Sequence, residues 1–239
     1  DETYLPRIED VEKAITPNTV GLVCSAPGGS FGTLDPVEAF ADLAWHKGLY
    51  LHVDAAFGGF ILPFMRDLGY DIPPFDLSVK GVSSIMTDGH KLGLLPIATG
   101  FFLANDSSMF ETIPTERTLI HTTSSTKPGS RAAGAWATFR NLGREGYRQS
   151  TAHVLKLRDI IAEGVTAIPG MGLAAPKFIS VIGFTSQTIN LQDVHDQMAE
   201  EGWGQGYGVQ RGMPFIRLSI HPSRSIEAAH GFVEAFERA

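Results

Sequence analysis

The stretches HVDAAFGG, residues 52–59, and TDGHKLG, residues 87–93, decide how this sequence is interpreted. Each stretch follows a short apolar run of the kind found in strands that are buried on both faces of a parallel sheet. Each should therefore lie at the carboxyl end of a strand. The first supplies a carboxylate, Asp54, and the second supplies an amine, Lys91, so we expect these two groups to meet at the mouth of one sheet.

The segments around these two stretches indicate an α/β fold. Residues 19–26 are typical of a buried strand, and a glycine-rich turn leads from it into a helix that starts at Asp35-Pro36, with Asp35 as its cap. A strand, a helix and a further strand joined by short links form a right-handed crossover unit in a parallel sheet. The apolar patterns predict further strands at 49–56, 82–88 and 98–104, and helices at 8–15, 36–47, 131–148 and 151–163, the last two separated around Gly143–Gly146.

The pattern changes after residue 170. Strands are expected at 178–185 and 215–221, and helices at 191–202 and 223–239. We therefore assign residues 169–239 to a small C-terminal α+β domain. Residues 1–168 are assigned to part of a large domain, which includes a loop at 105–130 that is rich in Ser, Thr and Pro.

The composition limits the classes of function. The formal net charge of −7 argues against nucleic acid as a partner, and no apolar run is long enough for a membrane helix. The acidic N-terminal segment does not have the pattern of a signal peptide. Cys24 is the only cysteine, which excludes an internal disulfide and favours a reducing, cytoplasmic location.

The chemistry of the two strand ends points to a cofactor. A carboxylate that follows a strand buried on both faces is costly unless a cation or a hydrogen bond compensates it, and the protonated nitrogen of a pyridine ring is a suitable cation. A lysine amine at the neighbouring strand end can form a Schiff base with an aldehyde cofactor. Alone, Asp54 would be interpreted as a turn residue and Lys91 as a solvated side chain. Together they predict pyridoxal 5'-phosphate as the cofactor.

These motifs also carry a family resemblance. HVDAAFGGF and TDGHKLG resemble the motifs of the group II pyridoxal-phosphate-dependent decarboxylases, and of the related sphingosine phosphate lyases, in the aminotransferase-like fold type I. The likeness continues through LVCSAPGGSFGTLDPV, GSRAAGAWATFRNLGREGY and GWG…IRLSIHP, and so covers nearly the whole chain. The resemblance implies a mostly parallel sheet and a homodimer with a shared active site.

The resemblance assigns roles to single residues. Asp54 would pair with the pyridine nitrogen and Lys91 would carry the Schiff base. Ala56 would pack against the ring, while His90 and Asp88 would lie at the phosphate. Two further positions, Gly129 and Ser130, would approach the cofactor of the partner subunit, where a bare N–H and a short hydroxyl donor suit the role.

Three departures from the family pattern matter. Relatives carry a long additional stretch upstream with the main phosphate-binding turn, so we expect a sheet that is incomplete at its N-terminal side and a separate N-terminal fragment as a partner. Residues 101–130 contain no tyrosine to donate a proton, which leaves His121 as the nearest candidate acid, or as an exposed loop histidine. The threonine that often contacts the cofactor's phenolic oxygen is missing, and either Ser25 or Ser30 is available in its place.

Arg217 bears on the substrate. It lies within a short apolar strand, on the face opposite Ile216 and Leu218, where an arginine is suited to bind a carboxylate. Its alternative role is a surface ion pair with Glu234 or Glu237.

The sequence therefore favours a pyridoxal-phosphate-dependent carboxy-lyase of carboxylic acid metabolism that acts on an aromatic or acidic L-amino acid. Three alternatives stay open: a lyase of the sphingosine phosphate type, a metal-dependent hydrolase, and a non-catalytic fragment. The hydrolase would use ligands drawn from the two strand ends, namely His52, Asp54, Asp88 and His90, but it gives Lys91 no role, and the favoured reading has no metal site.

Overall fold

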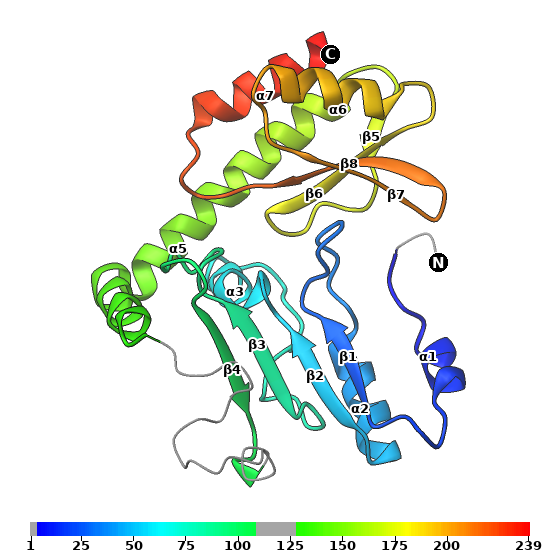
Figure 1. The fold of residues 1–239 in the computed structure, drawn as a ribbon, viewed down its shortest axis with the longest axis vertical. Coiled ribbons are helices and arrows are strands. Elements are labelled where there is room, and N and C mark those ends of the chain that lie inside the picture. The colour runs from blue at the N-terminus through cyan, green and yellow to red at the C-terminus, as the bar shows by residue number, and fades with distance from the viewer. Residues whose placement is uncertain (1–3, 109–127) are drawn as a thin grey trace. The chain divides into compact units, whose positions relative to one another are not determined.

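The computed structural model describes residues 4–108 and 128–239, and the chain forms two compact units (Figure 1). Unit 2 contains Pro6–Pro27 and Asp35–Tyr147, and unit 1 contains Gly28–Leu34, Arg148–Ala239 and the N-terminal residues up to Leu5. The units change over at Tyr147 and Arg148, whereas the sequence placed its boundary at residues 168 and 169. The assignment of 1–168 and 169–239 as domains stays a prediction.

The sheet of unit 2 carries both motif stretches. Its strand order is β1-β2-β3-β4, from β1 (Gly21–Ser25) through β2 (Tyr50–Asp54) and β3 (Ser84–Asp88) to β4 (Gly100–Ala104). The first three strands are parallel and β4 is antiparallel to β3, which confirms the expected mostly parallel sheet. β2 and β3 end at Asp54 and Asp88, so the predicted strand ends are confirmed as well.

Short helices accompany this sheet: α1 (Ile8–Ala14), α2 (Val37–Lys47), the 3₁₀ turn η1 (Gly58–Phe60) and α3 (Leu62–Asp67). Helix α2 packs on β1 and β2 through an apolar face that includes Phe40 and Ala44, and Gly48 ends it in the left-handed conformation. The expected cap is wrong, because Pro36 occupies the N-cap position and no side chain caps the helix.

Burial raises the pKa of the Cys24 thiol in β1 to about 12, so this thiol is not a nucleophile at neutral pH.

The long helix α5 (Ser130–Thr166) contains the expected break. Gly143 has φ 56° and ψ −170°, a conformation that an L-residue with a side chain adopts only with strain, and it interrupts the helix between two regular segments. The sequence predicted helices at 131–148 and 151–163 with a separation around Gly143–Gly146. The break at Gly143 lies within that interval.

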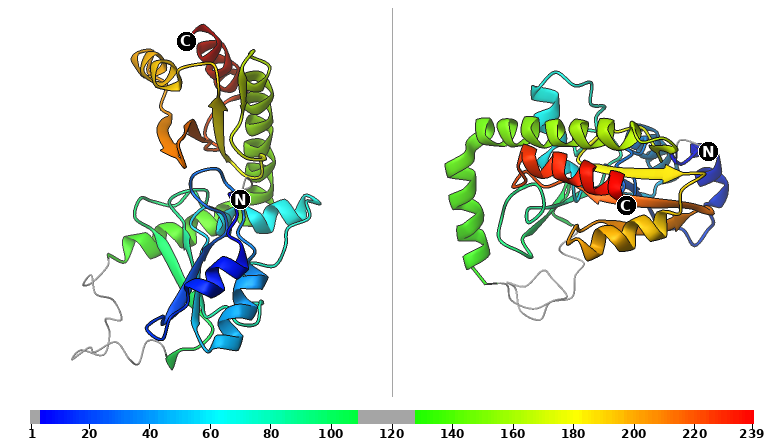
Figure 2. Two further views of the ribbon diagram at one scale, coloured as in Figure 1. Left: turned by 90° about the vertical axis from the view of Figure 1, so that its right-hand side faces the viewer. Right: turned by 90° about the horizontal axis from the view of Figure 1, so that it is seen from above.

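Unit 1 is built around an antiparallel sheet of order β5-β6-β8-β7. The strands are β5 (Met171–Leu173), β6 (Val181–Ser186), β7 (Gly206–Gln210) and β8 (Met213–Ser219), and the helices are α6 (Leu191–Glu200) and α7 (Ile226–Arg238). Both helices lie on one face of the sheet (Figure 2), and Phe184 of β6 meets Phe236 of α7 in this core. The expected α+β character is confirmed, while β5 and β7 were not anticipated.

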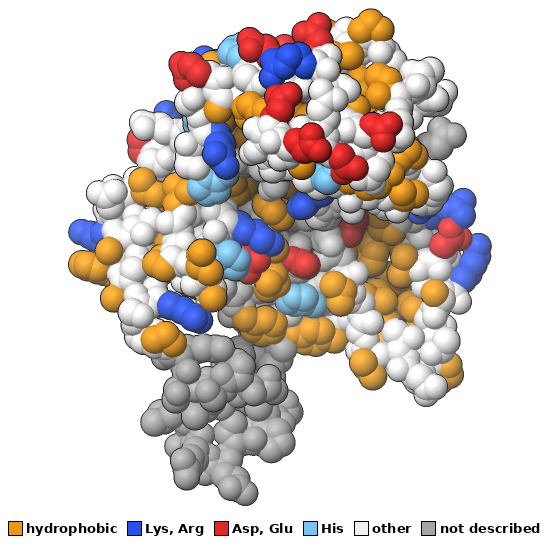
Figure 3. Space-filling view, turned by 45° about the horizontal axis from the view of Figure 1, so that its top comes forward, with side chains coloured by type: hydrophobic (Ala, Val, Ile, Leu, Met, Phe, Trp, Pro, Cys, Tyr) orange, Lys and Arg blue, Asp and Glu red, His pale blue; other side chains and the backbone are white. Residues whose placement is uncertain are grey.

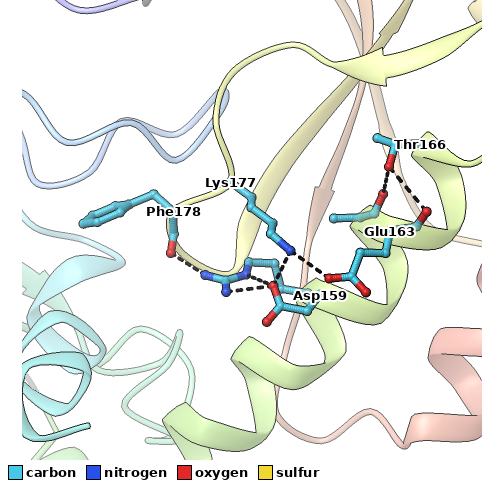
Figure 4. Close-up of polar contacts among 7 residues, drawn as sticks. Asp159, Glu163, Thr166, Lys177 and Phe178 are labelled. Carbon is cyan, nitrogen blue, oxygen red and sulfur yellow. Dashed lines mark hydrogen bonds and ion pairs between the residues drawn. The ribbon is translucent and has the colours of Figure 1, made fainter. Parts of the chain in front are cut away.

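A network of charged side chains ties α5 to the segment before β6 (Figure 4). The buried Arg158 guanidinium donates to the Phe178 carbonyl at 2.6 Å and to the Asp159 carboxylate at 2.8 Å. Lys177 bridges Asp159 and Glu163 at 2.8 Å and 3.2 Å. Because each hydrogen bond of Arg158 goes to an acceptor within unit 1, the network compensates the cost of burying its charge.

Both helices on the sheet of unit 1 carry acidic side chains, with Asp193, Asp196 and Glu200 in α6 and Glu227, Glu234 and Glu237 in α7. Several acidic side chains gather in the upper part of the view in Figure 3. No helix in the described part of the chain is both long enough and apolar enough to cross a membrane.

Candidate active site

Asp54 lies half-buried at the carboxyl end of β2, next to the end of β1. In the sheet register it lies opposite Ser25 of β1 and Met86 of β3, so the Ser25 and Asp54 side chains are on the same face of the sheet. One carboxylate oxygen accepts the Ala56 N–H at 3.0 Å, and that bond fixes the turn after the strand. No cation lies within ion-pair distance of Asp54 in the part of the chain that the structure describes. The second oxygen is thus available to a ligand.

Lys91 follows β3 and is already bound to a carboxylate. Its Nζ atom lies 2.9 Å from the Asp88 carboxylate and 4.3 Å from the centre of the Phe57 ring. The Asp88 N–H donates to the Ala56 carbonyl at 3.2 Å, which joins the turn after β2 to the end of β3. One backbone hydrogen bond therefore joins the two motif stretches, and the expected meeting of the Asp54 and Lys91 side chains stays a prediction.

His90 has one ring nitrogen committed and one available. Its Nδ1 atom lies 3.0 Å from the Thr99 carbonyl, which can only accept, so Nδ1 carries the proton and donates. Its Nε2 atom lies 3.9 Å from the Asp88 carboxylate, beyond hydrogen-bond distance. The Nε2 atom is therefore free to contact a ligand beside Lys91.

The turn after β2 is packed too closely for side chains. A Cβ atom on Gly58 would lie 1.8 Å from the Ala26 carbonyl oxygen, and a Cβ on Gly59 would lie 2.2 Å from Thr87 Oγ1. Gly58 lets the turns after β1 and β2 approach each other, and Gly59 lets the turn after β2 lie against Thr87 of β3.

We expect Gly58→Ala to lower the free energy of unfolding by about 3 kcal/mol, because backbone has to move to admit the new methyl group. Chemical denaturation of the purified protein measures the change. Gly172→Ala in β5 is the matched control, since a Cβ there has no neighbour within 4 Å. Its effect should stay within about 0.5 kcal/mol. A Gly58→Ala protein as stable as the control would contradict the close approach.

An aromatic cluster that was not predicted from the sequence packs against the loop that contains Lys91. Tyr147 at the end of the unit 2 part of α5 contacts Phe60, Phe64 and Phe139, with ring centres 5.2–6.3 Å apart. Its hydroxyl donates to the Gly93 carbonyl at 2.6 Å, and burial raises the pKa of Tyr147, so the hydroxyl stays a donor at neutral pH. The rigid cluster thereby holds the segment that follows Lys91.

Arg217 lies in β8 of unit 1, between the buried Ile216 and Leu218. Its buried Nε atom has no hydrogen-bond partner among the described residues, and burial lowers the pKa of its guanidinium. It forms no ion pair with Glu234 or Glu237, both of which the structure describes, so that alternative is not realised. A buried, unpaired guanidinium donor is suited to bind an anionic group.

The other predicted residues fall in different places. Ala56 lies in the turn after β2, Gly129 and Ser130 are exposed at the start of α5, and Ser30 belongs to the unit 1 loop. His121 lies outside the described residues. The His52 Nδ1 atom forms a hydrogen bond with the Ser84 hydroxyl at 2.6 Å. No cluster of three or more metal-ligating side chains occurs in residues 4–108 and 128–239. The metal-hydrolase alternative thus gains no geometric support.

The fold and the paired strand ends define a protein of the fold type I class, and the structural comparisons agree. A sphingosine-1-phosphate lyase from Burkholderia pseudomallei superposes with a TM-score of 0.89 at 29% identity, over 99% of this chain and 55% of the other. A glutamate decarboxylase from Lactobacillus brevis superposes with the same TM-score at 20% identity, over 100% of this chain and 58% of the other.

The sequence comparisons identify the family. Residues 6–186 match the family described as the pyridoxal-dependent decarboxylase conserved domain, and the chain belongs to that family. A probable L-aspartate decarboxylase of Thermococcus gammatolerans is 36% identical over 99% of this chain and 62% of its own length. A sphingosine-1-phosphate lyase of Oryza sativa is 38% identical over 85% of this chain and 39% of its own length.

The resemblance drawn from the two motif stretches is therefore confirmed, and so is pyridoxal phosphate as the cofactor of the family. The chain spans less than two thirds of the length of these curated relatives.

Proposed function

We propose that this protein is a pyridoxal-phosphate-dependent lyase that decarboxylates an L-amino acid. The observation that carries the proposal is the pairing at adjacent parallel strand ends: a carboxylate with one free oxygen, Asp54, and a primary amine, Lys91, joined through the Asp88–Ala56 backbone hydrogen bond. When bound, pyridoxal phosphate supplies an electron-accepting ring for breaking a bond next to the substrate nitrogen.

The donor set of this chain fits the cofactor. The free Asp54 oxygen would hold a proton on the ring nitrogen, and the Lys91 amine would be the group that attaches the cofactor covalently. The His90 Nε2 atom is available to the phosphate, and Ala56 presents only a methyl group where the ring would pack. The Ser25 hydroxyl, on the same face as Asp54, is the candidate partner of the phenolic oxygen.

Lys91 has to leave Asp88 before it can react. Its Nζ atom lies 2.9 Å from the Asp88 carboxylate. Attack on an aldehyde would require the free amine at a position away from that carboxylate. Asp88 therefore holds and orients the lysine until the aldehyde arrives.

Arg217 favours decarboxylation over the alternative. A buried, unpaired guanidinium Nε suits the carboxylate of an amino acid, and we assign it to substrate binding. Retro-aldol cleavage of a long-chain base phosphate is the second candidate, supported by the identity to the rice and Burkholderia lyases. The names of archaeal relatives support L-aspartate as the first substrate to test.

The remaining features of the proposal concern the assembly. A homodimer is supported by the exposed Trp136 side chain of α5, which presents a large apolar surface. Trp136 lies a few residues after Gly129 and Ser130 in the chain. The proposed roles of Gly129 and Ser130 at a partner's cofactor depend on that dimer. A reducing, cytoplasmic location is supported by the single buried cysteine, Cys24.

Two measurements test the function. The protein loaded with pyridoxal phosphate is expected to form a borohydride-stable adduct on the peptide that contains Lys91, detected by mass spectrometry. It is also expected to release carbon dioxide from at least one of L-aspartate, L-glutamate, L-tyrosine and L-tryptophan. An adduct without carbon dioxide release, together with cleavage of a long-chain base phosphate, would favour the second candidate. No adduct at all would refute both.

A further inference from the structure

The backbone of Ser25 lies at an edge of the unit 2 sheet. Among the strands of residues 4–108 and 128–239, β1 pairs with β2 alone, and the Ala26 N–H donates to the Asp54 carbonyl at 2.7 Å. Because backbone groups along a strand alternate in direction, the N–H and C=O of Ser25 point away from β2. No strand in the described residues pairs with that side, so both groups need other partners.

Asp35 provides both partners. Its Oδ2 atom accepts the Ser25 N–H at 2.7 Å, and its own N–H donates to the Ser25 carbonyl at 3.1 Å. The following Pro36 favours an extended conformation at Asp35, which suits this strand-like pairing. Burial raises the pKa of the Asp35 carboxyl, and the hydrogen bond from Ser25 counteracts that rise. One residue thus takes the place of a neighbouring strand.

The location of this pair gives it more than a structural role. The chain leaves unit 2 after Pro27 and returns to it at Asp35, and Gly28–Leu34 belongs to unit 1, where Phe31 packs against Phe215. The Ser25–Asp35 pair therefore closes the two ends of a loop whose middle is held elsewhere. Without it, the N–H and C=O of Ser25 would have no partner among the described residues.

We propose that Asp35 is a positioning residue of the cofactor site, which fixes the Ser25 backbone so that the Ser25 hydroxyl stays on the Asp54 face of the sheet. This inference rests on the proposed function, because it gives the Ser25 hydroxyl a cofactor to contact. Asp35 itself acts only through Ser25. Its effect on the cofactor must therefore disappear when the Ser25 hydroxyl is removed.

The first measurement uses the protein without cofactor. Hydrogen exchange should show the Ser25 amide exchanging at least about tenfold faster in Asp35→Ala, because its only acceptor is lost. The Ala26 amide, which is bonded to Asp54 instead, should change by less than about twofold. Asp35→Asn keeps an acceptor oxygen and should restore most of the protection. Asp42→Asn, at an exposed position of α2, is the matched control.

The second measurement is a double-mutant cycle on the affinity for pyridoxal phosphate, followed by absorbance titration. Asp35→Ala and Ser25→Ala are each expected to weaken binding about tenfold. The double variant should bind at most about twofold more weakly than either single variant. Asp35→Asn should bind within about threefold of the unsubstituted protein. Additive losses would show that Asp35 does not act through Ser25 and would overturn the inference.

The outcomes separate the two proposals. If the unsubstituted protein binds pyridoxal phosphate and Asp35→Ala binds it equally well, only the positioning role fails. If the unsubstituted protein does not bind the cofactor, the proposed function fails and the positioning role fails with it. If Asp35→Ala leaves the Ser25 amide protected, the hydrogen-bond pair is not what holds the strand end, and the positioning role also fails.

Discussion

Replacement of Lys91 by alanine is expected to reduce turnover of the cofactor-loaded protein by about 10³-fold or more, the size of loss seen when a nucleophilic residue is removed. Lys91 supplies the primary amine at this strand end, 2.9 Å from Asp88 and 4.3 Å from the Phe57 ring. Without it, the cofactor has no covalent attachment at the carboxyl end of β3. Steady-state release of carbon dioxide and the borohydride-stable adduct together measure the effect.

Two further substitutions give this experiment its controls. Lys91→Arg keeps a cation beside Asp88 but has no primary amine, so it should lose the adduct just as alanine does. Lys80→Ala removes a lysine of the same unit that lies over the Trp45 ring at 4.2 Å, and both adduct and turnover should persist. Turnover by Lys91→Ala at an unchanged rate would contradict the assignment, whatever the stability of the variant.

The sequence predicted the centre of the site because strand ends leave a clear local pattern. The buried runs before Asp54 and Asp88 show the length and composition of parallel strands, and both residues end the strands expected of them. Gly143 was recognisable as a helix break for a similar reason, since glycine tolerates the positive φ found there. Each of these features depends on residues that are adjacent in the chain.

The parts that escaped prediction depend on residues far apart in the sequence. Asp35 has the local pattern of a helix cap. Its carboxylate instead accepts the N–H of Ser25, ten positions away. Tyr147 reaches Gly93 across 54 positions, and nothing near either residue indicates the bond. Strand β5 has only three residues and β7 has two glycines among five, so neither shows a strand pattern, and they form because β6 and β8 offer edges to pair with.

Asp54→Asn is expected to lower kcat by about 10²–10³-fold, the usual loss when one preorganised electrostatic group is removed from an active site. Asparagine keeps the shape of the side chain and still accepts the Ala56 N–H, which is bonded to Oδ1 at 3.0 Å. It removes the negative charge that would hold the proton on the cofactor's ring nitrogen. Because Lys91 is unchanged, the borohydride-stable adduct should still form while turnover falls.

The stability of the same variant should move in the opposite direction. In the cofactor-free protein no cation of the described residues compensates the burial of the half-buried Asp54 carboxylate, so a neutral amide is expected to leave the melting temperature unchanged or to raise it. The matched control is Asp71→Asn, which replaces an exposed carboxylate of the same unit and should change neither turnover nor the melting temperature. A loss of turnover accompanied by an equal loss of stability would show that Asp54 serves the fold. A loss of turnover in a protein at least as stable would show that its charge is retained for the cofactor.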